Sequence, residues 1–322
     1  MMKAMRISEY GGLDVLLLNE VPRPAPAADE ILIRLYASGV NLVDCVIREG
    51  GNEVLKPMIQ LPMTLGCDAA GVIEEIGSAV TAFQPGDAVY GIPNFPGNGS
   101  YAQFMAAKAS QFARKPVRID YGEASAIPLA GLTAWTGLFA DGKLESGQRL
   151  LINGAAGGVG SFAVQFAKAR GAYVIGTASA GNHAYLRELG ADEVLDYRQP
   201  NYADGLDAVD VVFDASPVRS DDSRRALIRI LKPGGILVSS QVDFPYSAAV
   251  QQDLENKRAA GELVFVQFNG DWLREIAELV DAGQVKVSIS KTYPLEQAAA
   301  AQREVETGHV RGKLVLDINH EG

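Results

Sequence analysis

The chain is poor in the side chains that bind zinc or form disulfides. Its 322 residues include two cysteines, Cys45 and Cys67, and three histidines. Two cysteines are too few for a disulfide framework or for a multi-cysteine zinc site, so both kinds of site are excluded. We interpret the two thiols as small buried hydrophobic groups in a reducing compartment.

Positive charge is also scarce, and no segment concentrates it. The 29 Lys and Arg residues stand against 39 Asp and Glu residues, for a formal net charge of −10. Proteins that bind nucleic acid need a basic patch to neutralise phosphates. We therefore expect no nucleic-acid partner.

Long apolar segments of the kind that enter membranes are few. Residues 1–12 lack the apolar stretch of a signal peptide, so we expect a cytoplasmic protein. The longest uncharged run, 150–167, contains four glycines, which a strand, turn and helix in water explain better than a membrane span. A small molecule is thus the expected partner, without a membrane.

The length predicts two domains, because one hydrophobic core rarely serves more than about 250–300 residues. Short β-like runs at 31–36, 70–76 and 87–92 are separated by Gly, Pro and Asn. Short strands with frequent turns are typical of a barrel-like β unit, which we place at residues 1–121.

Apolar strands then alternate with helical patterns over residues 122–270, which predicts a doubly wound parallel sheet. After this block, an amphipathic helix at 271–282 precedes two further strands, so 1–121 and 271–322 form one split domain. The strands predicted for the second block lie at 149–153, 173–177, 209–214, 236–240 and 263–268, and its helices include 159–169, 183–189 and 223–231.

A glycine-rich turn, Gly154-Ala155-Ala156-Gly157-Gly158-Val159-Gly160, follows the predicted strand 149–153 directly and opens a helix. Small residues let the backbone approach a pyrophosphate, and a helix N-terminus supplies free N–H groups and positive potential. A tight turn that binds nothing is the alternative for a lone glycine motif. Here strand, turn, helix and spacing agree, so we predict dinucleotide binding.

The turn after strand 173–177 bears on whether the cofactor carries a 2′-phosphate, as NADPH does and NADH does not. An NAD-binding fold places an acidic residue there for the ribose 2′-hydroxyl, whereas this turn contains Ser179 and Asn182 and no Asp or Glu. This favours NADPH over NADH, and Arg198 after the next strand could reach the 2′-phosphate. The alternative for Ser179 and Asn182 is helix N-capping, which needs the same residue types.

These motifs together resemble a known family. Residues 147–160, with Gln165 and Lys168, resemble the signature of the quinone oxidoreductase and zeta-crystallin branch of the medium-chain dehydrogenases. The resemblance extends over nearly the whole chain, through Gly39-Val40-Asn41-Leu42-Val43-Asp44 and the segments 66–71, 86–91 and 308–313.

The resemblance implies an α/β fold with a GroES-like β-barrel catalytic domain, a Rossmann doubly wound parallel sheet, and a cleft between them. It implies NADPH-dependent hydride transfer to a quinone, or alternatively to a 2-alkenal or enone C=C bond. An NADPH-binding, crystallin-like structural or regulatory protein with weak turnover is a further alternative. The residues implied to bind the cofactor are Thr133, Gly157, Gly158, Val159, Ser179, Asn182, Tyr197, Ser240, Gln241, Phe265 and Lys313.

Asn41 and Asp44 are the catalytic candidates, because the resemblance places both at the cleft. Asn41 would hydrogen-bond an acceptor oxygen or the cofactor ribose; alternatively it is a turn residue that bonds its own backbone. For Asp44 the alternative is a structural ion pair with Arg48, four residues further along a helix.

No metal is expected in this site. Zinc alcohol dehydrogenases of this fold carry Cys-His-Thr-Asp where this chain has Asn41-Leu42-Val43-Asp44, and Gly-His-Glu where it has Gly66-Cys67-Asp68. A catalytic zinc needs about three protein ligands, and Asn41 and Leu42 are not zinc ligands. Without a Lewis acid, an acceptor that spreads its own charge, such as a quinone or enone, suits the site best.

The run 263–268, Leu-Val-Phe-Val-Gln-Phe, would be the last strand of the parallel sheet. An exposed apolar edge strand pairs readily with its symmetry mate, so we expect a homodimer. A loop that covers the edge is the alternative.

Overall fold

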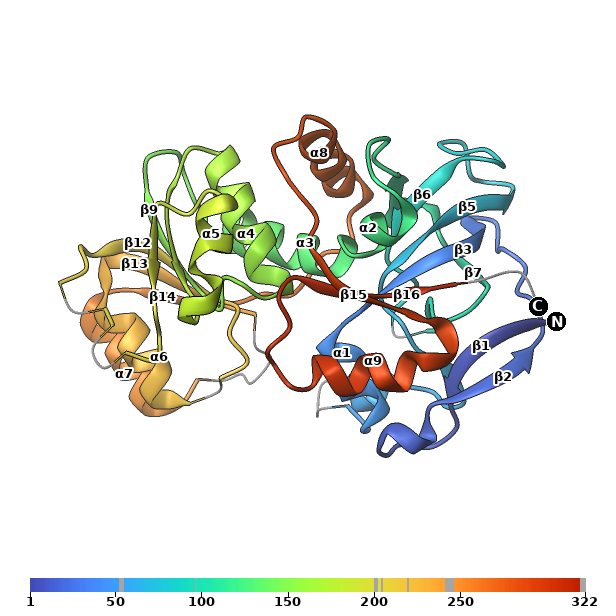
Figure 1. Ribbon diagram of the computed structural model, residues 1–322, viewed down its shortest axis with the longest axis horizontal. Helices are drawn as coiled ribbons and strands as arrows, with labels where there is room; N and C mark the ends of the chain where they lie inside the picture. The colour runs from blue at the N-terminus through green and yellow to red at the C-terminus, as the bar shows by residue number, and fades with distance from the viewer. Residues whose placement is uncertain are drawn as a thin grey trace. The chain divides into compact units, whose positions relative to one another are not determined.

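The computed structural model describes residues 1–51, 55–95, 97–199, 202–203, 205–218, 220–240 and 246–318. Its contacts divide the chain into two compact units (Figure 1). The sequence had suggested a division at 121/122 and 270/271. Unit 1 comprises Met1–Leu129, Phe268–Gly283 and Val287–Gly322, and unit 2 comprises Ala130–Gln267 and Gln284–Lys286.

Unit 1 is organised around the long strand β3 (Glu30–Val40). This strand pairs antiparallel with β5 (Ala69–Ile76), β7 (Phe104–Lys108) and β16 (Lys313–Asp317). Ile31, Ile33 and Leu35 alternate along β3 and belong to one buried core. The remaining strands of its sheet are β6 (Ala88–Gly91), β8 (Phe112–Arg114) and β15 (Ile289–Pro294), and a smaller sheet contains β1 (Met2–Ile7), β2 (Leu17–Val21) and β4 (Met63–Thr64).

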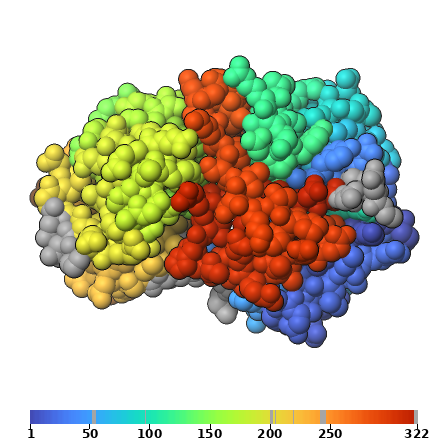
Figure 2. Space-filling view, in the orientation of Figure 1, coloured from blue at the N-terminus to red at the C-terminus, as the bar shows by residue number. Residues whose placement is uncertain are grey.

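Helices of unit 1 cover its sheets. Helix α1 (Leu42–Arg48) follows β3 directly and packs against α9 (Ala298–Val305). Arg48 is only 1% exposed, and its guanidinium contacts Gln302 of α9. Helix α9 forms part of the surface on this face of unit 1 (Figure 2). The other helices are α2 (Tyr121–Ser125) and α8 (Gly270–Asp281), and α3 (Pro128–Trp135) leads from unit 1 into unit 2.

Unit 2 is a parallel six-stranded sheet with the order β11-β10-β9-β12-β13-β14. One row of side chains crosses it in register: Ile175, Leu151, Val212 and Leu237, all fully buried. Both faces of the sheet are covered, so successive residues of each strand are buried and the strands are continuously apolar. The strands are β9 (Arg149–Asn153), β10 (Tyr173–Thr177), β11 (Glu193–Leu195), β12 (Val209–Asp214), β13 (Leu231–Ser239) and β14 (Ala260–Leu263).

The order of these strands creates a switch point between β9 and β12. From β9 the chain moves outward through β10 to β11, then returns to β12 and moves the other way. Figure 1 shows α4 and α5 on one side of the sheet and α6 and α7 on the other. Ligands of doubly wound sheets bind at the carboxyl ends of the strands at such a point. The helices are α4 (Gly158–Ala169), α5 (His183–Glu188), α6 (Asp221–Arg229) and α7 (Ala248–Lys257).

The predicted strand 263–268 is wrong in position. The last strand, β14, spans Ala260–Leu263, and pairing with β13 ends at Ser239 and Leu263 because β13 itself stops there. Beyond it, Phe265 is 65% exposed. Across the described part of the chain, no helix is long and apolar enough to cross a membrane.

Candidate functional site

The glycine-rich turn lies at the switch point of unit 2, with Gly157 at the N-cap of α4. A side chain at Gly160 would place its Cβ 2.3 Å from the carbonyl oxygen of Gly154, and Gly154 itself has φ of 77°. Both positions therefore require glycine. The first N–H groups of α4, including those of Gly158 and Val159, have no partner inside the helix and carry the positive end of its dipole. This cradle fits a dinucleotide pyrophosphate.

Hydrogen bonds among polar side chains at the ends of β9, β10 and β12 stabilise the turn. The Gly154 N–H donates to Oγ1 of Thr177 at 3.1 Å, and that hydroxyl donates to Oδ1 of Asn153 at 2.7 Å. The Asn153 amide then donates to Oδ1 of Asp214 at 2.9 Å. Asn153 and Asp214 end β9 and β12, the strands on either side of the switch point. Sequence reasoning missed both, although two adjacent apolar strands that end in polar residues were a usable signal.

Ser240 belongs to the same edge of the sheet. Its backbone N–H and its hydroxyl both donate to the carbonyl oxygen of Asp214, at 3.0 Å and 3.2 Å. Of the other residues that the resemblance implies to bind the cofactor, Thr133 is 8% exposed on α3 and Phe265 lies on the surface after β14. Gln241 lies outside the described residues.

Ser179 and Asn182 flank the short turn after β10, where the adenosine end is expected. Both occupy N-cap positions, as the capping alternative predicts, but neither side chain makes a capping hydrogen bond there. Instead the Asn182 amide donates to Oγ of Ser179 at 3.4 Å. Tyr197, from the loop after β11, is 48% exposed.

An acidic residue that sequence reasoning missed, Asp196, lies beside this turn. Its carboxylate accepts from the Arg198 guanidinium at 3.2 Å through both Nε and Nη2. The side chain of Arg198, then its backbone N–H, and further the N–H of Ala180, hold the pKa of Asp196 below its ordinary value. The turn after β10 contains no carboxylate of its own. Asp196, which follows the neighbouring strand β11, lies beside it, and Arg198 neutralises its charge.

In unit 1, Asn41 lies in a cluster of buried polar side chains with Asp68 and Lys313. The Asn41 amide donates to Oδ2 of Asp68 at 2.8 Å, and its Oδ1 accepts from the Lys313 ammonium. Lys313 also donates to the carbonyl oxygen of Val40 at 3.1 Å and to Oδ2 of Asp68 at 3.3 Å. Asn41 is also the N-cap of α1 and takes part in a capping box with Asp44, so the local alternative for Asn41 holds beside its contacts in the cluster.

Strand register assembles this cluster. Leu314 of β16 lies opposite Val40 of β3, which places Lys313 beside Asn41. Asp68 immediately precedes β5, and a Cβ at Gly39 would lie 2.5 Å from its Oδ2. The glycine thus makes room for the carboxylate.

Asp44 is fully enclosed, which corrects the prediction that it faces a cleft. It accepts from the backbone N–H of Asn41 and from the Tyr101 hydroxyl, each at 2.9 Å. Burial raises its pKa to about 6, although these hydrogen bonds and the Cys67 thiol act to lower it. Its structural alternative, a pair with Arg48, is wrong as well.

Arg48 has other partners. Its guanidinium donates to Gln302 at 2.7 Å and to Glu306 at 2.6 Å, both from the C-terminal part of unit 1. These bonds tie α1 to α9. Arg48 therefore stabilises the packing of α1 against α9. Among the described residues it forms no ion pair with Asp44, so it does not connect α1 to the polar cluster in this way.

Both cysteines are buried, and burial raises the pKa of each thiol. A thiol with a raised pKa is a poor nucleophile. Within the described residues, no group of three or more His, Cys, Asp or Glu side chains is arranged to hold a metal ion.

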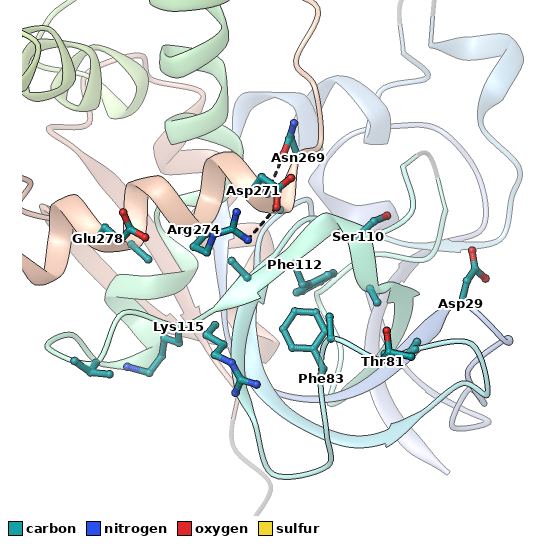
Figure 3. A pocket seen from close by; sticks show the side chains of 18 of the residues that line it. Asp29, Thr81, Phe83, Ser110, Phe112, Lys115, Asn269, Asp271, Arg274 and Glu278 are labelled. Carbon is teal, nitrogen blue, oxygen red and sulfur yellow. Dashed lines mark hydrogen bonds and ion pairs between the residues drawn. The ribbon is translucent and has the colours of Figure 1, made fainter.

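A groove of about 670 Å³ lies elsewhere in unit 1, between α8 and β8 (Figure 3). Phe83 and Phe112 form part of its apolar lining, and Arg274 pairs with Asp271 at 3.0 Å on its α8 side. The lining shares no residue with the polar cluster or the glycine-rich turn. We do not assign the reaction to this groove.

Comparisons with known proteins identify the family to which the chain is similar. Residues 27–117 match the family described as alcohol dehydrogenase GroES-like domain, and residues 189–316 match zinc-binding dehydrogenase. A quinone oxidoreductase from Mus musculus is 31% identical over 98% of this chain and 98% of its own length. An NADPH-dependent alkenal/one oxidoreductase, chloroplastic, from Arabidopsis thaliana is 34% identical over 98% of this chain and 79% of its own.

A solved structure shares the whole fold. The quinone oxidoreductase from Coxiella burnetii superposes with a TM-score of 0.90 at 33% sequence identity, and the match covers 99% of both chains.

Proposed function

This chain belongs to the zinc-independent quinone oxidoreductase branch of the medium-chain dehydrogenase/reductase superfamily, and we propose that it transfers a hydride from NADPH to a quinone. As a member of this branch it is an oxidoreductase that depends on a pyridine nucleotide. The proposal rests on two features that occur in the same chain. One is the glycine cradle that fits a pyrophosphate. The other is Asn41, a neutral amide donor at the position where zinc enzymes of this fold carry a cysteine ligand.

Unit 2 supplies the residues that would hold the nucleotide. The N–H groups of Gly158 and Val159 would bind its pyrophosphate, and the side chains of Ser179 and Asn182 would bind the adenosine ribose. When bound, NADPH supplies the two electrons of the reduction as hydride.

We assign NADPH in preference to NADH on the arrangement around Arg198. A guanidinium has five N–H groups, and two of them serve Asp196. The remaining N–H groups are on the side away from Asp196, and a 2′-phosphate is the acceptor that suits them. Arg198 would then bind the 2′-phosphate while it still neutralises the charge of Asp196.

The acceptor chemistry follows from what the protein offers. A quinone takes up hydride and one proton to give a hydroquinone, while the nucleotide becomes NADP⁺. The negative charge that develops on the quinone oxygen is delocalised, so one hydrogen-bond donor and the exclusion of water suffice. Asn41 is our donor; Asp44 is enclosed, and we assign the final proton to bulk water after the hydride has been transferred.

A second candidate, reduction of the C=C bond of a 2-alkenal or enone, is favoured by the 34% identity to the alkenal/one oxidoreductase. The same donor would serve an enone oxygen. To separate the two, chelator-treated protein is mixed with NADPH and either 1,4-benzoquinone or a 2-alkenal, with a saturated aldehyde as control, and loss of NADPH absorbance is followed.

We expect faster turnover with the quinone and none with the saturated aldehyde. Faster turnover with the alkenal would move the assignment to C=C reduction. NADPH binding without turnover of either acceptor would overturn the enzymatic proposal in favour of a binding protein.

We also propose that the protein acts as a cytoplasmic homodimer. β14 is the terminal strand of the sheet in unit 2, and two such edges can pair across a twofold axis. The strand has only four residues, so the paired edge is short. Light scattering that gives a monomer mass at micromolar concentration would contradict the dimer.

A further inference from the structure

We propose that Lys313 and Asp68 fix the side-chain amide of Asn41 in one orientation, so that a single N–H of Asn41 is left to bind the acceptor oxygen. The proposal rests on the proposed function for the identity of that acceptor. It makes Lys313 and Asp68 positioning residues, whereas the sequence had suggested that Lys313 binds the cofactor directly.

The orientation of the amide follows from the charges on its two sides. An ammonium has only donors, so the Asn41 atom that faces Lys313 must be the oxygen. A carboxylate has only acceptors, so the Asn41 atom that faces Asp68, at 2.8 Å, must be the nitrogen. Rotating the amide by half a turn would set N–H against ammonium and oxygen against carboxylate. The ion pair therefore excludes the flipped amide.

Counting donors shows which group remains. The three N–H groups of Lys313 serve three acceptors: the carbonyl of Val40, Oδ1 of Asn41 and Oδ2 of Asp68. Both oxygens of Asp68 also accept hydrogen bonds, since its Oδ1 accepts from the backbone N–H of Leu129 at 2.6 Å. An asparagine amide has two N–H groups, and Asp68 takes one. The second N–H of Asn41 is what the trio can offer to a substrate.

All three residues are buried, and Asn41 is the most exposed of them. Asp68 is 0% exposed and Lys313 5%, whereas Asn41 is 8% exposed. A donor fixed before the substrate arrives needs no reorganisation as charge develops on the acceptor oxygen, which is how preorganised donors accelerate reactions. Without the pair, the amide could turn its oxygen toward the developing negative charge.

The test removes both charges together, because removing one would leave a buried charge without a partner. The variant is Lys313→Met with Asp68→Asn. The matched control is Arg48→Met with Glu306→Gln, which neutralises another ion pair of unit 1 whose arginine is also buried. Both proteins are first shown to be folded by thermal unfolding.

We expect kcat with 1,4-benzoquinone to fall about tenfold or more in the Lys313/Asp68 variant. The Kd for NADPH should stay within about twofold, because the glycine turn belongs to unit 2. The control should keep its kcat. A folded Lys313/Asp68 variant with the kcat of the wild type, or an equal loss in the control, would overturn the proposal.

A second readout does not depend on turnover. With ¹⁵N-labelled asparagine, the two amide protons of Asn41 are assigned by their loss in Asn41→Leu. The proton bound to Asp68 should lie downfield of the amide protons of solvent-exposed asparagines. Addition of NADP⁺ and hydroquinone should shift the other proton alone. A downfield proton in a wild type that reduces no acceptor would mean that the proposed function fails while the fixed orientation stands. Two Asn41 protons at the ordinary shifts of a solvent-exposed amide would overturn the orientation itself.

Discussion

The glycine-rich turn of unit 2 and the polar cluster of unit 1 are built in opposite ways. The turn uses backbone groups within seven consecutive residues, 154–160, and depends on the absence of side chains. The cluster uses side chains from distant parts of the chain: Lys313 and Asn41 are separated by 272 positions. A backbone site fails when anything is added, whereas a side-chain site fails when one partner is removed.

The largest effect is expected from adding a single methyl group to the turn. In Gly160→Ala the new Cβ would lie 2.3 Å from Gly154 O and 2.7 Å from Ala155 Cα, so the backbone must move. We expect NADPH binding to weaken by about a hundredfold or more. Gly157→Ala is the contrast: its Cβ would meet only Gly154 O at 3.5 Å, so that protein should keep a wild-type Tm. Titration calorimetry and thermal unfolding of both variants decide the matter, and equal behaviour would contradict the steric account.

The enclosed Asp44 should make stability depend on pH. Its pKa is raised from 3.8 to about 6, so the folded state holds the proton more tightly. The stability it contributes is complete below pH 3.8 and is lost as pH rises through about 6. A shift of about 2 units corresponds to roughly 3 kcal/mol.

Asp44→Asn should therefore flatten the fall in unfolding free energy between pH 4 and pH 6, because the titrating group is gone. Urea unfolding at several pH values measures this. NADPH affinity, which belongs to unit 2, serves as the control and should not change. The same slope in wild type and variant would show that Asp44 does not titrate in this range.

A smaller effect is expected where the turn itself depends on a side chain. Thr177→Val removes the hydroxyl that joins the Gly154 N–H to Asn153, leaving the part-buried N–H of Gly154 and the buried Oδ1 of Asn153 without this partner. We expect a loss of about 1–3 kcal/mol in unfolding free energy and weaker NADPH binding.

Thr136→Val is the matched control. Thr136 is 1% exposed, and within the described residues its Oγ1 has no hydrogen-bond partner. That substitution should be neutral or stabilising. A loss at Thr136 equal to that at Thr177 would mean that the hydroxyl chain does not support the turn.

The smallest effect concerns cofactor choice. Arg198→Ala should lower kcat/KM for NADPH roughly fivefold and change that for NADH little, because only NADPH has the phosphate. Arg187→Ala removes another exposed arginine, on α5, and should leave the ratio unchanged. A parallel loss for both nucleotides in Arg198→Ala would place Arg198 outside the 2′-phosphate site.

Local patterns allowed the turn to be predicted from sequence. The strand bounds 149–153, 173–177 and 209–214 agree with β9, β10 and β12, because buried parallel strands are continuous apolar runs. The edge strand was misplaced, since 263–268 is as apolar as a buried strand but its pairing is decided by where β13 ends.

The polar cluster could be predicted only in part. The resemblance identified Asn41 as a candidate, but its partners depend on the register of β16 on β3, which no local pattern encodes. The same holds for Asp196, which a neighbouring strand brings to the turn after β10. Asp44 and Arg48 had the spacing of a helical ion pair, yet burial gave each of them other partners.

The most direct test of the central claim is a single-turnover measurement on chelator-treated protein. The complex with NADPH deuterated at either face of nicotinamide C4 is mixed with 1,4-benzoquinone, and NADPH oxidation is followed by stopped flow. We predict rapid oxidation that one of the two deuterated nucleotides slows, because the protein takes hydride from one face only. Oxidation no faster than that of free NADPH, or no slowing with either nucleotide, would contradict direct hydride transfer by this protein.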